Sequence, residues 1–358
     1  MHEKFDQSAA VARVRATLES SQLATADRIS EINSRYIGLS RDKVVADALA
    51  AMVSSIATVD TAAISKPDKR RIVAICGDSG AGKTRALIEH TSRIPAMQPY
   101  VDEDGIEVRP FLSYNAPSPC TPRLLAFAGL EALGYPIKKT LQEHQAWALF
   151  QDMLKVHRIM FVMIDESQHA VDTADVLMTT KIGNAFKNLV QMPDWPVRLI
   201  LAGVAPLPSF LARKQLYNRR TVIRFDKIKG NAVKETIPTV LQQVVVAHAK
   251  LNLGDGLAGD FPKRLAHACD GDFGSIVQMV RGAVELAILD NSQVVDLKHF
   301  VRVYASYSGC MPGENMFKTD RWAEMVPYTA FMREEDHAWE KAHFEAKKRK
   351  PTKFGVRP

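Results

Sequence analysis

An eight-residue phosphate-binding motif constrains this chain more than any other feature. The apolar run 72–76 precedes it and the helix-forming run 85–89 follows it, so it lies between a predicted strand and a predicted helix. Glycines there let backbone N–H groups surround phosphate oxygens, and a helix N-terminus adds partial positive charge. The motif matches GxxxxGK[ST] and, with the residue after it, predicts binding of a nucleoside triphosphate by Gly77, Asp78, Ser79, Gly80, Ala81, Gly82, Lys83, Thr84 and Arg85. The alternative is a decayed loop that no longer binds.

A second run supports nucleotide chemistry. Lys83 is expected to reach the β- and γ-phosphates, and the Thr84 hydroxyl to bind Mg²⁺. The apolar run 158–164 reads as a buried parallel strand that ends in Asp165-Glu166. At the carboxyl end of that strand, Asp165 would hold Mg²⁺ through water and Glu166 would orient or deprotonate the attacking water. An apolar run before two acids is more often a strand meeting solvent, but behind a phosphate loop it favours hydrolysis.

Composition indicates a soluble protein of about two domains. The chain has 358 residues, of which 46% are hydrophobic and 24% charged. It contains no stretch of eighteen apolar residues, and its polar start does not resemble a signal peptide. The four cysteines have no paired spacing, which argues against a zinc site or a disulfide framework and favours reduced thiols in the cytoplasm.

Positive charge gathers at the C-terminus. The chain carries a net charge of +7, and residues 341–358 hold seven basic side chains against Glu345. Such a terminus is either a solvated, disordered tail or an arm that binds a polyanion such as DNA or another partner. The sequence leaves both interpretations open.

The order of elements predicts an α/β domain with a parallel sheet flanked by helices, followed by a small all-helical domain. Expected strands at 72–76, 108–114, 158–164 and 197–203 alternate with expected helices at 121–133, 140–156 and 181–191. Another helix should follow Ser40, with the apolar face Val44, Val45, Ala48, Leu49 and Met52. We therefore expect a helical N-terminal segment at 1–67, an ATPase domain at 68–229, a helical lid at 230–308 and a charged, basic appendage at 309–358.

This arrangement resembles the AAA+ P-loop NTPases. The individual sequence motifs are similar to those of one branch of these NTPases, the transposition ATPases TniB and TnsC, which are related to the target-selection protein MuB. The likeness rests on the segment 35–41, the phosphate loop, the strand end 164–170, and the pair 203–206 and 215–220. Together these segments span roughly residues 30–305.

The resemblance implies roles for further residues. Arg219 would be an arginine finger that meets the γ-phosphate bound by a neighbouring subunit, although 218–220 alone reads as a solvated turn. Tyr36 and Ile37 would line the adenine, although an apolar pair before a helix is more often simple packing. DNA-facing positions would be Arg123, Lys138 and Lys139, each of which is equally an ordinary exposed base.

Two positions depart from the family pattern. Val204 stands where a polar sensor is expected, and Ser275 where the lid arginine is expected, although Arg281 lies further along that helix. Losing both would slow hydrolysis without preventing binding.

The resemblance implies an ATP-dependent regulator of DNA transposition, with ATP and Mg²⁺ as cofactors. It would oligomerise as a ring or filament on duplex DNA with little sequence preference, and recruit a transposase and a targeting protein to the target. Alternatives are a replication initiator or helicase loader, which should carry a DNA-binding domain after the lid, and a signalling or defence NTPase that does not bind DNA. A third is a scaffold that binds ATP but barely hydrolyses it.

Overall fold

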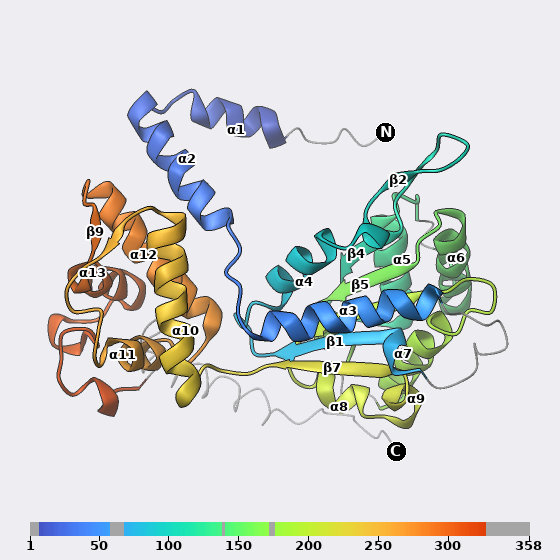
Figure 1. The fold of residues 1–358 in the computed structure, drawn as a ribbon. Coiled ribbons are helices and arrows are strands. Elements are labelled where there is room, and N and C mark those ends of the chain that lie inside the picture. Colours follow the sequence, from blue (N-terminus) through green and yellow to red (C-terminus); the bar gives the residue numbers. More distant parts are fainter. Residues whose placement is uncertain (1–6, 58–67, 138–139, 172–175, 327–358) are drawn as a thin grey trace, which may run out of the picture. The chain divides into compact units, whose positions relative to one another are not determined.

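The computed structural model describes residues 7–57, 68–137, 140–171 and 176–326 (Figure 1). The chain divides into two compact units, one made of Gly38–Asp226 and the other of Met1–Ile37 together with Lys227–Pro358. Lys138 and Lys139 lie outside the described residues. The domain boundaries expected from the sequence stay a prediction.

A five-stranded parallel sheet forms the centre of the Gly38–Asp226 unit. Its order is β4 (Phe111–Asn115), β5 (Phe161–Asp165), β6 (Arg198–Gly203), β1 (Ile72–Gly77) and β7 (Arg220–Phe225). All strands run in one direction, so their carboxyl ends share one edge of the sheet. The expected parallel α/β fold is confirmed, and β6 separates the phosphate-loop strand from the strand that ends in Asp165.

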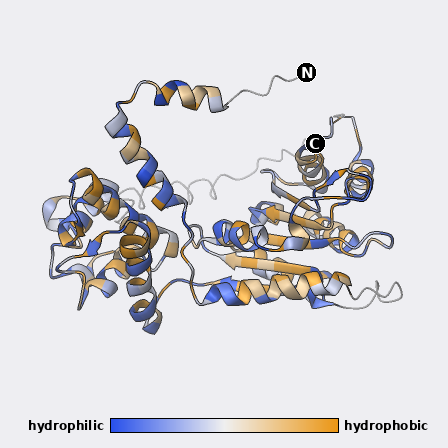
Figure 2. Ribbon diagram, turned by 45° about the horizontal axis from the view of Figure 1, so that its top comes forward, coloured by the Kyte–Doolittle hydropathy of each residue, from blue (hydrophilic) through white to orange (hydrophobic). Residues whose placement is uncertain are grey.

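Helices cover both faces of this sheet because its side chains alternate between them. Ile72, Ala74 and Cys76 belong to one hydrophobic core. The helices in that core are α5 (Pro122–Ala132), α6 (Glu143–Val156), α7 (Val176–Leu189), α8 (Leu207–Leu211) and α9 (Lys214–Tyr217). On the other face, α3 (Arg41–Ala57) and α4 (Lys83–Ser92) contact β1. Figure 2 shows the hydrophobic character of the strands against the mixed character of the helices.

Local sequence explains most of these boundaries. Thr121 caps α5, since its hydroxyl accepts the Leu124 N–H at 3.1 Å and Pro122 occupies the first turn. The predicted strand 108–114 divides at Pro110: Glu107–Val108 is β3, which pairs with β2 (Tyr100–Val101), and only Phe111–Asn115 joins the sheet. Proline has no N–H for the ladder.

Two further expectations need correction. The turn expected near Arg220 is the start of β7, a strand that periodicity did not reveal because exposed Arg224 interrupts its apolar side chains. On α3, Val45, Leu49 and Met52 are fully buried as expected, but Val44 is 53% exposed because it lies off the buried stripe.

The unit made of Met1–Ile37 and Lys227–Pro358 is called the lid unit below, and the Gly38–Asp226 unit is called the ATPase unit. The described part of the lid unit is helical. Its helices are α1 (Gln7–Arg15), α2 (Ser20–Ser34), α10 (Asn231–Leu241), the π-helix Gln242–His248, α11 (Phe261–Ala268), α12 (Phe273–Leu289) and α13 (Leu297–Ser308). A two-residue parallel pair, β8 (Asn252–Leu253) with β9 (Val294–Val295), lies among them. Helix α2 packs on α12, far away in the sequence.

The core of the lid extends past Ser308. Phe317 is 1% exposed and its ring contacts those of Phe261, Phe300 and Tyr304 at centroid distances of 5.6–5.9 Å. Phe317 lies in the segment expected to be a charged appendage, where its apolar side chain instead completes an aromatic cluster.

Within the described residues, no helix is long and apolar enough to cross a membrane.

Candidate nucleotide-binding site

The phosphate loop takes its shape from its glycines. Gly77 ends β1 opposite Phe225, and a Cβ on Gly77 would lie 2.5 Å from the Phe225 carbonyl oxygen. Gly80 and Gly82 have φ angles of 78° and 85°, which side chains rarely adopt. Because Gly82 caps α4, the loop leads directly into a helix N-terminus, where backbone N–H groups are available to an anion.

Lys83 lies in the first turn of α4 with its amine inside the loop. Its Nζ donates to the carbonyl oxygens of Gly77 at 3.0 Å and Asp78 at 2.8 Å, and the residue is only 9% exposed. The ammonium group is therefore held within the curve of the loop. A phosphate bound there would meet this charge together with the helix N-terminus.

Thr84 and Asp165 meet at the carboxyl edge of the sheet. The Thr84 hydroxyl donates to Asp165 Oδ2 at 2.5 Å, and Asp165 is 5% exposed. Its other oxygen, Oδ1, accepts the Glu166 N–H at 2.8 Å. A hydroxyl and a carboxylate are hard oxygen ligands, so this pair fits Mg²⁺ that is otherwise bound by phosphate and water. Bound Mg²⁺ would neutralise phosphate charge as the terminal phosphoryl group leaves.

Glu166 follows in a strained conformation. Its φ of 51° and ψ of 33° lie in the left-handed region, which side chains other than glycine avoid. The Gln168 amide Nε2 donates to Glu166 Oε2, and the Gln168 Oε1 accepts the Val204 N–H at 3.2 Å. Strain of this kind gathers at functional sites, where surrounding contacts hold it.

Arg41 holds the loop from outside the motif. Its Nη2 donates to the Ala81 carbonyl at 2.8 Å, and its guanidinium carbon lies 3.9 Å from the centroid of the Phe225 ring. Arg41 begins α3 and is part of the segment that carried the family resemblance, but no motif assigns it to the site. The only signal was its position at the end of that segment.

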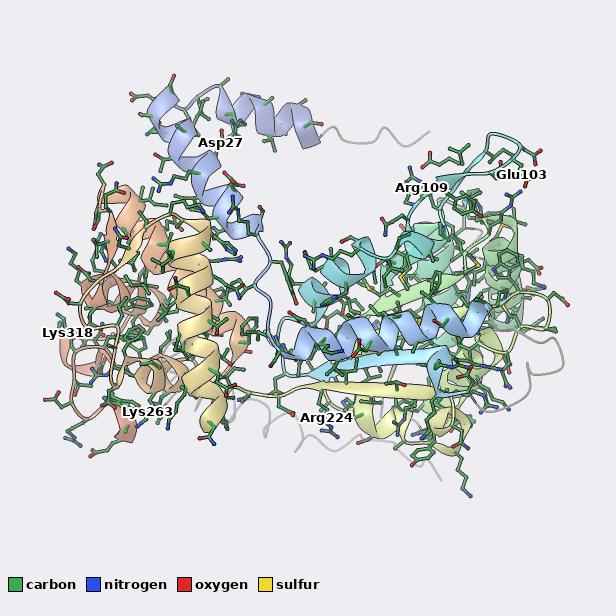
Figure 3. All side chains as sticks on the ribbon, in the orientation of Figure 1. Asp27, Glu103, Arg109, Arg224, Lys263 and Lys318 are labelled. Carbon is green, nitrogen blue, oxygen red and sulfur yellow. The ribbon has the colours of Figure 1, made fainter. Side chains whose placement is uncertain are left out.

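The thiol of Cys76, directly before the loop, reports the electrostatics of this edge. Burial raises the pKa of Cys76 to about 11, while the positive charges of Arg224 and Lys83 oppose that rise. Arg224 lies opposite Cys76 on the exposed edge strand β7 (Figure 3). The Cys76 thiol therefore stays neutral at neutral pH. The positive charges of Arg224 and Lys83 favour an anion at this edge of the sheet.

Arg219 lies at the other end of the sheet. Its carbonyl accepts the N–H of Ile72, the first residue of β1, whereas the phosphate loop follows the last residue of that strand. Five residue steps along β1 separate these ends by roughly 16 Å. Burial lowers the pKa of the neighbouring Arg71, Asp68 opposes this shift, and the charge of Arg219 adds to it. Arg219 thus belongs to a positively charged edge remote from its own phosphate loop.

Other predicted residues lie in different settings. Arg85 is on the exposed side of α4. Arg123 is half-buried in the first turn of α5, with its guanidinium carbon 5.2 Å from the centroid of the Phe127 ring. Tyr36 and Ile37 are the last two residues of the N-terminal part of the lid unit, and the ATPase unit begins at the next residue, Gly38. Their adenine role and the DNA role of Arg123 stay predictions.

The structure shows the surroundings of Val204 and Ser275, the two residues that depart from the family's sensor pattern. Val204 follows β6 and offers only its backbone N–H, which Gln168 accepts. Ser275 lies in the first turn of α12, where both its N–H and its hydroxyl donate to Asp272, at 2.9 and 2.6 Å. Asp272 is therefore the N-cap of α12 and Ser275 donates to it, while Arg281 donates to the Arg35 carbonyl at 2.7 Å within the lid unit.

Comparisons with known proteins agree with this fold. Residues 66–211 match the family of AAA domains. Cdc6p from Pyrobaculum aerophilum is similar in structure, with a TM-score of 0.50 and 15% identity over 79% of this chain and 71% of that one. The ORC2 protein of Aeropyrum pernix, solved as ADPNP–ADP complexes, has a TM-score of 0.49 and 15% identity over 75% and 69%. A comparison with curated protein sequences finds no match. The chain therefore has the fold of an AAA+ P-loop NTPase, and its residues 66–211 are similar to AAA domains.

Proposed function

We propose that this protein is an ATP-dependent DNA-binding regulator of DNA transposition. ATP drives its subunits to assemble on duplex DNA, the assembly recruits a transposase to the target, and hydrolysis dissolves it. The position of Arg219 carries this proposal, because an arginine remote from its own phosphate loop can complete a site only in a neighbouring subunit.

The hydrolytic step is supported by the contacts around Asp165. Lys83 would hold the β- and γ-phosphates, Thr84 and Asp165 would hold Mg²⁺, and Glu166 would orient or deprotonate the attacking water. With an apolar side chain at Val204 and a serine at 275 that bonds the helix cap Asp272, hydrolysis should be slow. Slow hydrolysis suits a switch that stays assembled while ATP lasts.

Coupling to assembly follows from charge. Arg219 and Arg71 lie together at the edge where β1 begins, and burial also lowers the pKa of nearby Arg198 to about 10. Asp68 offsets part of the charge of Arg71 and Arg198, and the triphosphate of an adjacent subunit would supply a further anion to half-buried Arg219. Binding of ATP would thereby strengthen the contact between subunits.

DNA binding is proposed from net charge and from the family resemblance. The chain carries a net charge of +7, and Arg123 follows the carboxyl edge of β4. Lys138 and Lys139 are the other candidate contacts. Such side chains would contact phosphates, so binding should be salt-sensitive and almost independent of sequence.

A replication initiator or helicase loader is the second candidate, favoured by the structural likeness to Cdc6p. The two candidate functions differ in the preference for DNA sequence and in the protein that is recruited. An initiator should prefer particular duplex sequences, whereas a transposition regulator should bind arbitrary duplexes and retain a transposase.

The first experiment measures binding to an arbitrary DNA duplex with ATP, ADP or a non-hydrolysable ATP analogue across a salt series. Tight, salt-sensitive binding with large assemblies only in the triphosphate states is expected. Arg219→Ala should bind ATP but not assemble, while Lys214→Ala, an exposed base on the nearby helix α9, should behave as wild type. Binding that ignores nucleotide, or its complete absence, would overturn the proposal in favour of a signalling NTPase.

A mixing experiment tests whether Arg219 acts between subunits. Lys83→Ala keeps the finger but loses the phosphate contact, whereas Arg219→Ala keeps the loop but lacks the finger. Each variant alone should be inactive, and their mixture should recover part of the ATPase rate. If the mixture stays inactive while wild-type subunits are active, Arg219 does not serve a neighbour's site.

A further inference from the structure

The side chain of Gln168 connects the two parts of the site on which hydrolysis depends. Gln168 lies in the short 3₁₀ helix Ser167–Ala170 that follows β5, and it is 8% exposed. Its Nε2 donates to Glu166, and its Oε1 accepts the Val204 N–H at 3.2 Å. One amide therefore bridges the proposed water-activating carboxylate and the end of the neighbouring strand β6.

The chemistry of both partners fixes the direction of this amide. A carboxylate can only accept hydrogen bonds, and a backbone N–H can only donate one. The amide satisfies both contacts only with its nitrogen toward Glu166 and its oxygen toward Val204. A reversed amide would set an acceptor against an acceptor and a donor against a donor.

The end of β6 is shaped to admit this side chain. A Cβ on Gly203 would lie 2.7 Å from Gln168 Oε1 and 3.1 Å from the Gln168 backbone nitrogen. Glycine at 203 is therefore needed for the approach of residue 168. The close fit leaves the Gln168 side chain little freedom to move away from Glu166 and Val204.

We propose that Gln168 is the positioning residue for Glu166 and replaces the polar sensor side chain that Val204 lacks. Its amide holds Glu166 Oε2, which leaves Oε1 of the same carboxylate to meet the attacking water. It also holds Glu166 in its left-handed conformation, with φ of 51°. The inference rests on the proposed ATP hydrolysis and names a residue that acts through Glu166 rather than on the nucleotide.

The first test compares Gln168→Ala and Gln168→Glu with wild type in ATP turnover and in nucleotide affinity. A hydrogen bond to a charged group implies a loss of about 10- to 100-fold in kcat for Gln168→Ala. Gln168→Glu keeps the acceptor for Val204 but sets a second carboxylate against Glu166, so it should lose at least as much. Affinity for ATP should stay within about twofold in both, since the hydrogen bonds described for the Gln168 side chain go to Glu166 and Val204.

Rescue separates a positioning role from a structural one. Val204→Thr has nearly the shape of valine but adds a hydroxyl at the strand end. In the Gln168→Ala background it should restore part of kcat if the hydroxyl occupies the space left by the Gln168 amide, which is bonded to the backbone of residue 204. As a matched control, Gln98→Ala removes a half-buried glutamine whose Nε2 donates to the Thr91 carbonyl at 2.8 Å, and kcat should not change.

The outcomes distinguish this inference from the function on which it rests. If wild-type protein shows no ATP turnover, the proposed function fails. If wild type turns over but both Gln168 variants match it, the positioning role is refuted. If Gln168→Ala loses ATP affinity as much as turnover and Val204→Thr restores neither, Gln168 merely supports the fold and the inference is also refuted.

Discussion

Replacing Arg41 should weaken nucleotide binding although Arg41 lies outside the phosphate-loop motif. Its guanidinium donates to the Ala81 carbonyl at 2.8 Å and stacks on Phe225 at 3.9 Å. Arg41→Ala removes both contacts. The loop then has to be ordered by the nucleotide itself, and that ordering opposes binding.

The magnitude follows from the two contacts. A hydrogen bond from a charged group contributes about 1.5–3 kcal/mol. Cation–π stacking at a half-exposed site adds about 0.5–1 kcal/mol. We assume that the free energy of the Arg41–Ala81 hydrogen bond keeps the loop ordered for binding. Its loss should then raise the Kd for ATP about 10- to 100-fold, since 1.4 kcal/mol corresponds to a factor of ten.

Isothermal titration with ATP and with ADP would measure this change. Lys43→Ala is the matched control, because Lys43 lies on the same helix but its side chain is 80% exposed and paired with Asp47. That exposed pair contributes little, so the control should bind like wild type. Equal ATP affinity in Arg41→Ala, with the fold intact by circular dichroism, would refute the role assigned to Arg41.

Three further predictions concern the same edge of the sheet. Glu166→Gln should reduce ATP turnover at least about 100-fold with ATP affinity unchanged, and turnover equal to wild type would contradict its role. Gly77→Ala should lower the free energy of unfolding by about 1–3 kcal/mol in urea titrations, because its Cβ would lie 2.5 Å from a backbone oxygen, whereas Gly38→Ala meets only ordinary contacts and should not. Alkylation at pH 8, followed by mass spectrometry, should modify half-buried Cys310 well before Cys76, since a pKa of about 11 leaves almost no thiolate at Cys76 until the pH approaches that value; equal rates would be inconsistent with its burial.

Sequence reasoning predicted the fold correctly, whereas the roles it assigned to the site residues stay predictions. The phosphate loop and the pair Asp165-Glu166 are short motifs at strand ends, and the expected parallel sheet with helices on both faces is confirmed. Arg41 and Gln168 escaped notice because each acts through a contact between elements distant in the chain, and no spacing rule reports such a contact.

The missed strand β7 and the unexpected burial of Phe317 have a similar cause. Edge strand β7 begins at Arg220 and carries exposed Arg224, so it lacks the continuous apolar run of the buried strands. The burial of Phe317 depends on three aromatic partners that no local pattern identifies. In both cases tertiary contacts, rather than local preference, determine the outcome.

The packing of α2 on α12 also has a consequence for synthesis of the protein. The Arg28 guanidinium donates to the carbonyl of Ala249, 221 residues later in the chain. On the ribosome, α2 emerges early, yet its partners are translated only after the entire ATPase unit. Until those partners have been translated, α2 has no partner helix to pack against. The sheet of the ATPase unit, which follows α2 in the sequence, can already form. The ATPase unit should therefore fold first during translation, and closure of the lid core should be the last step.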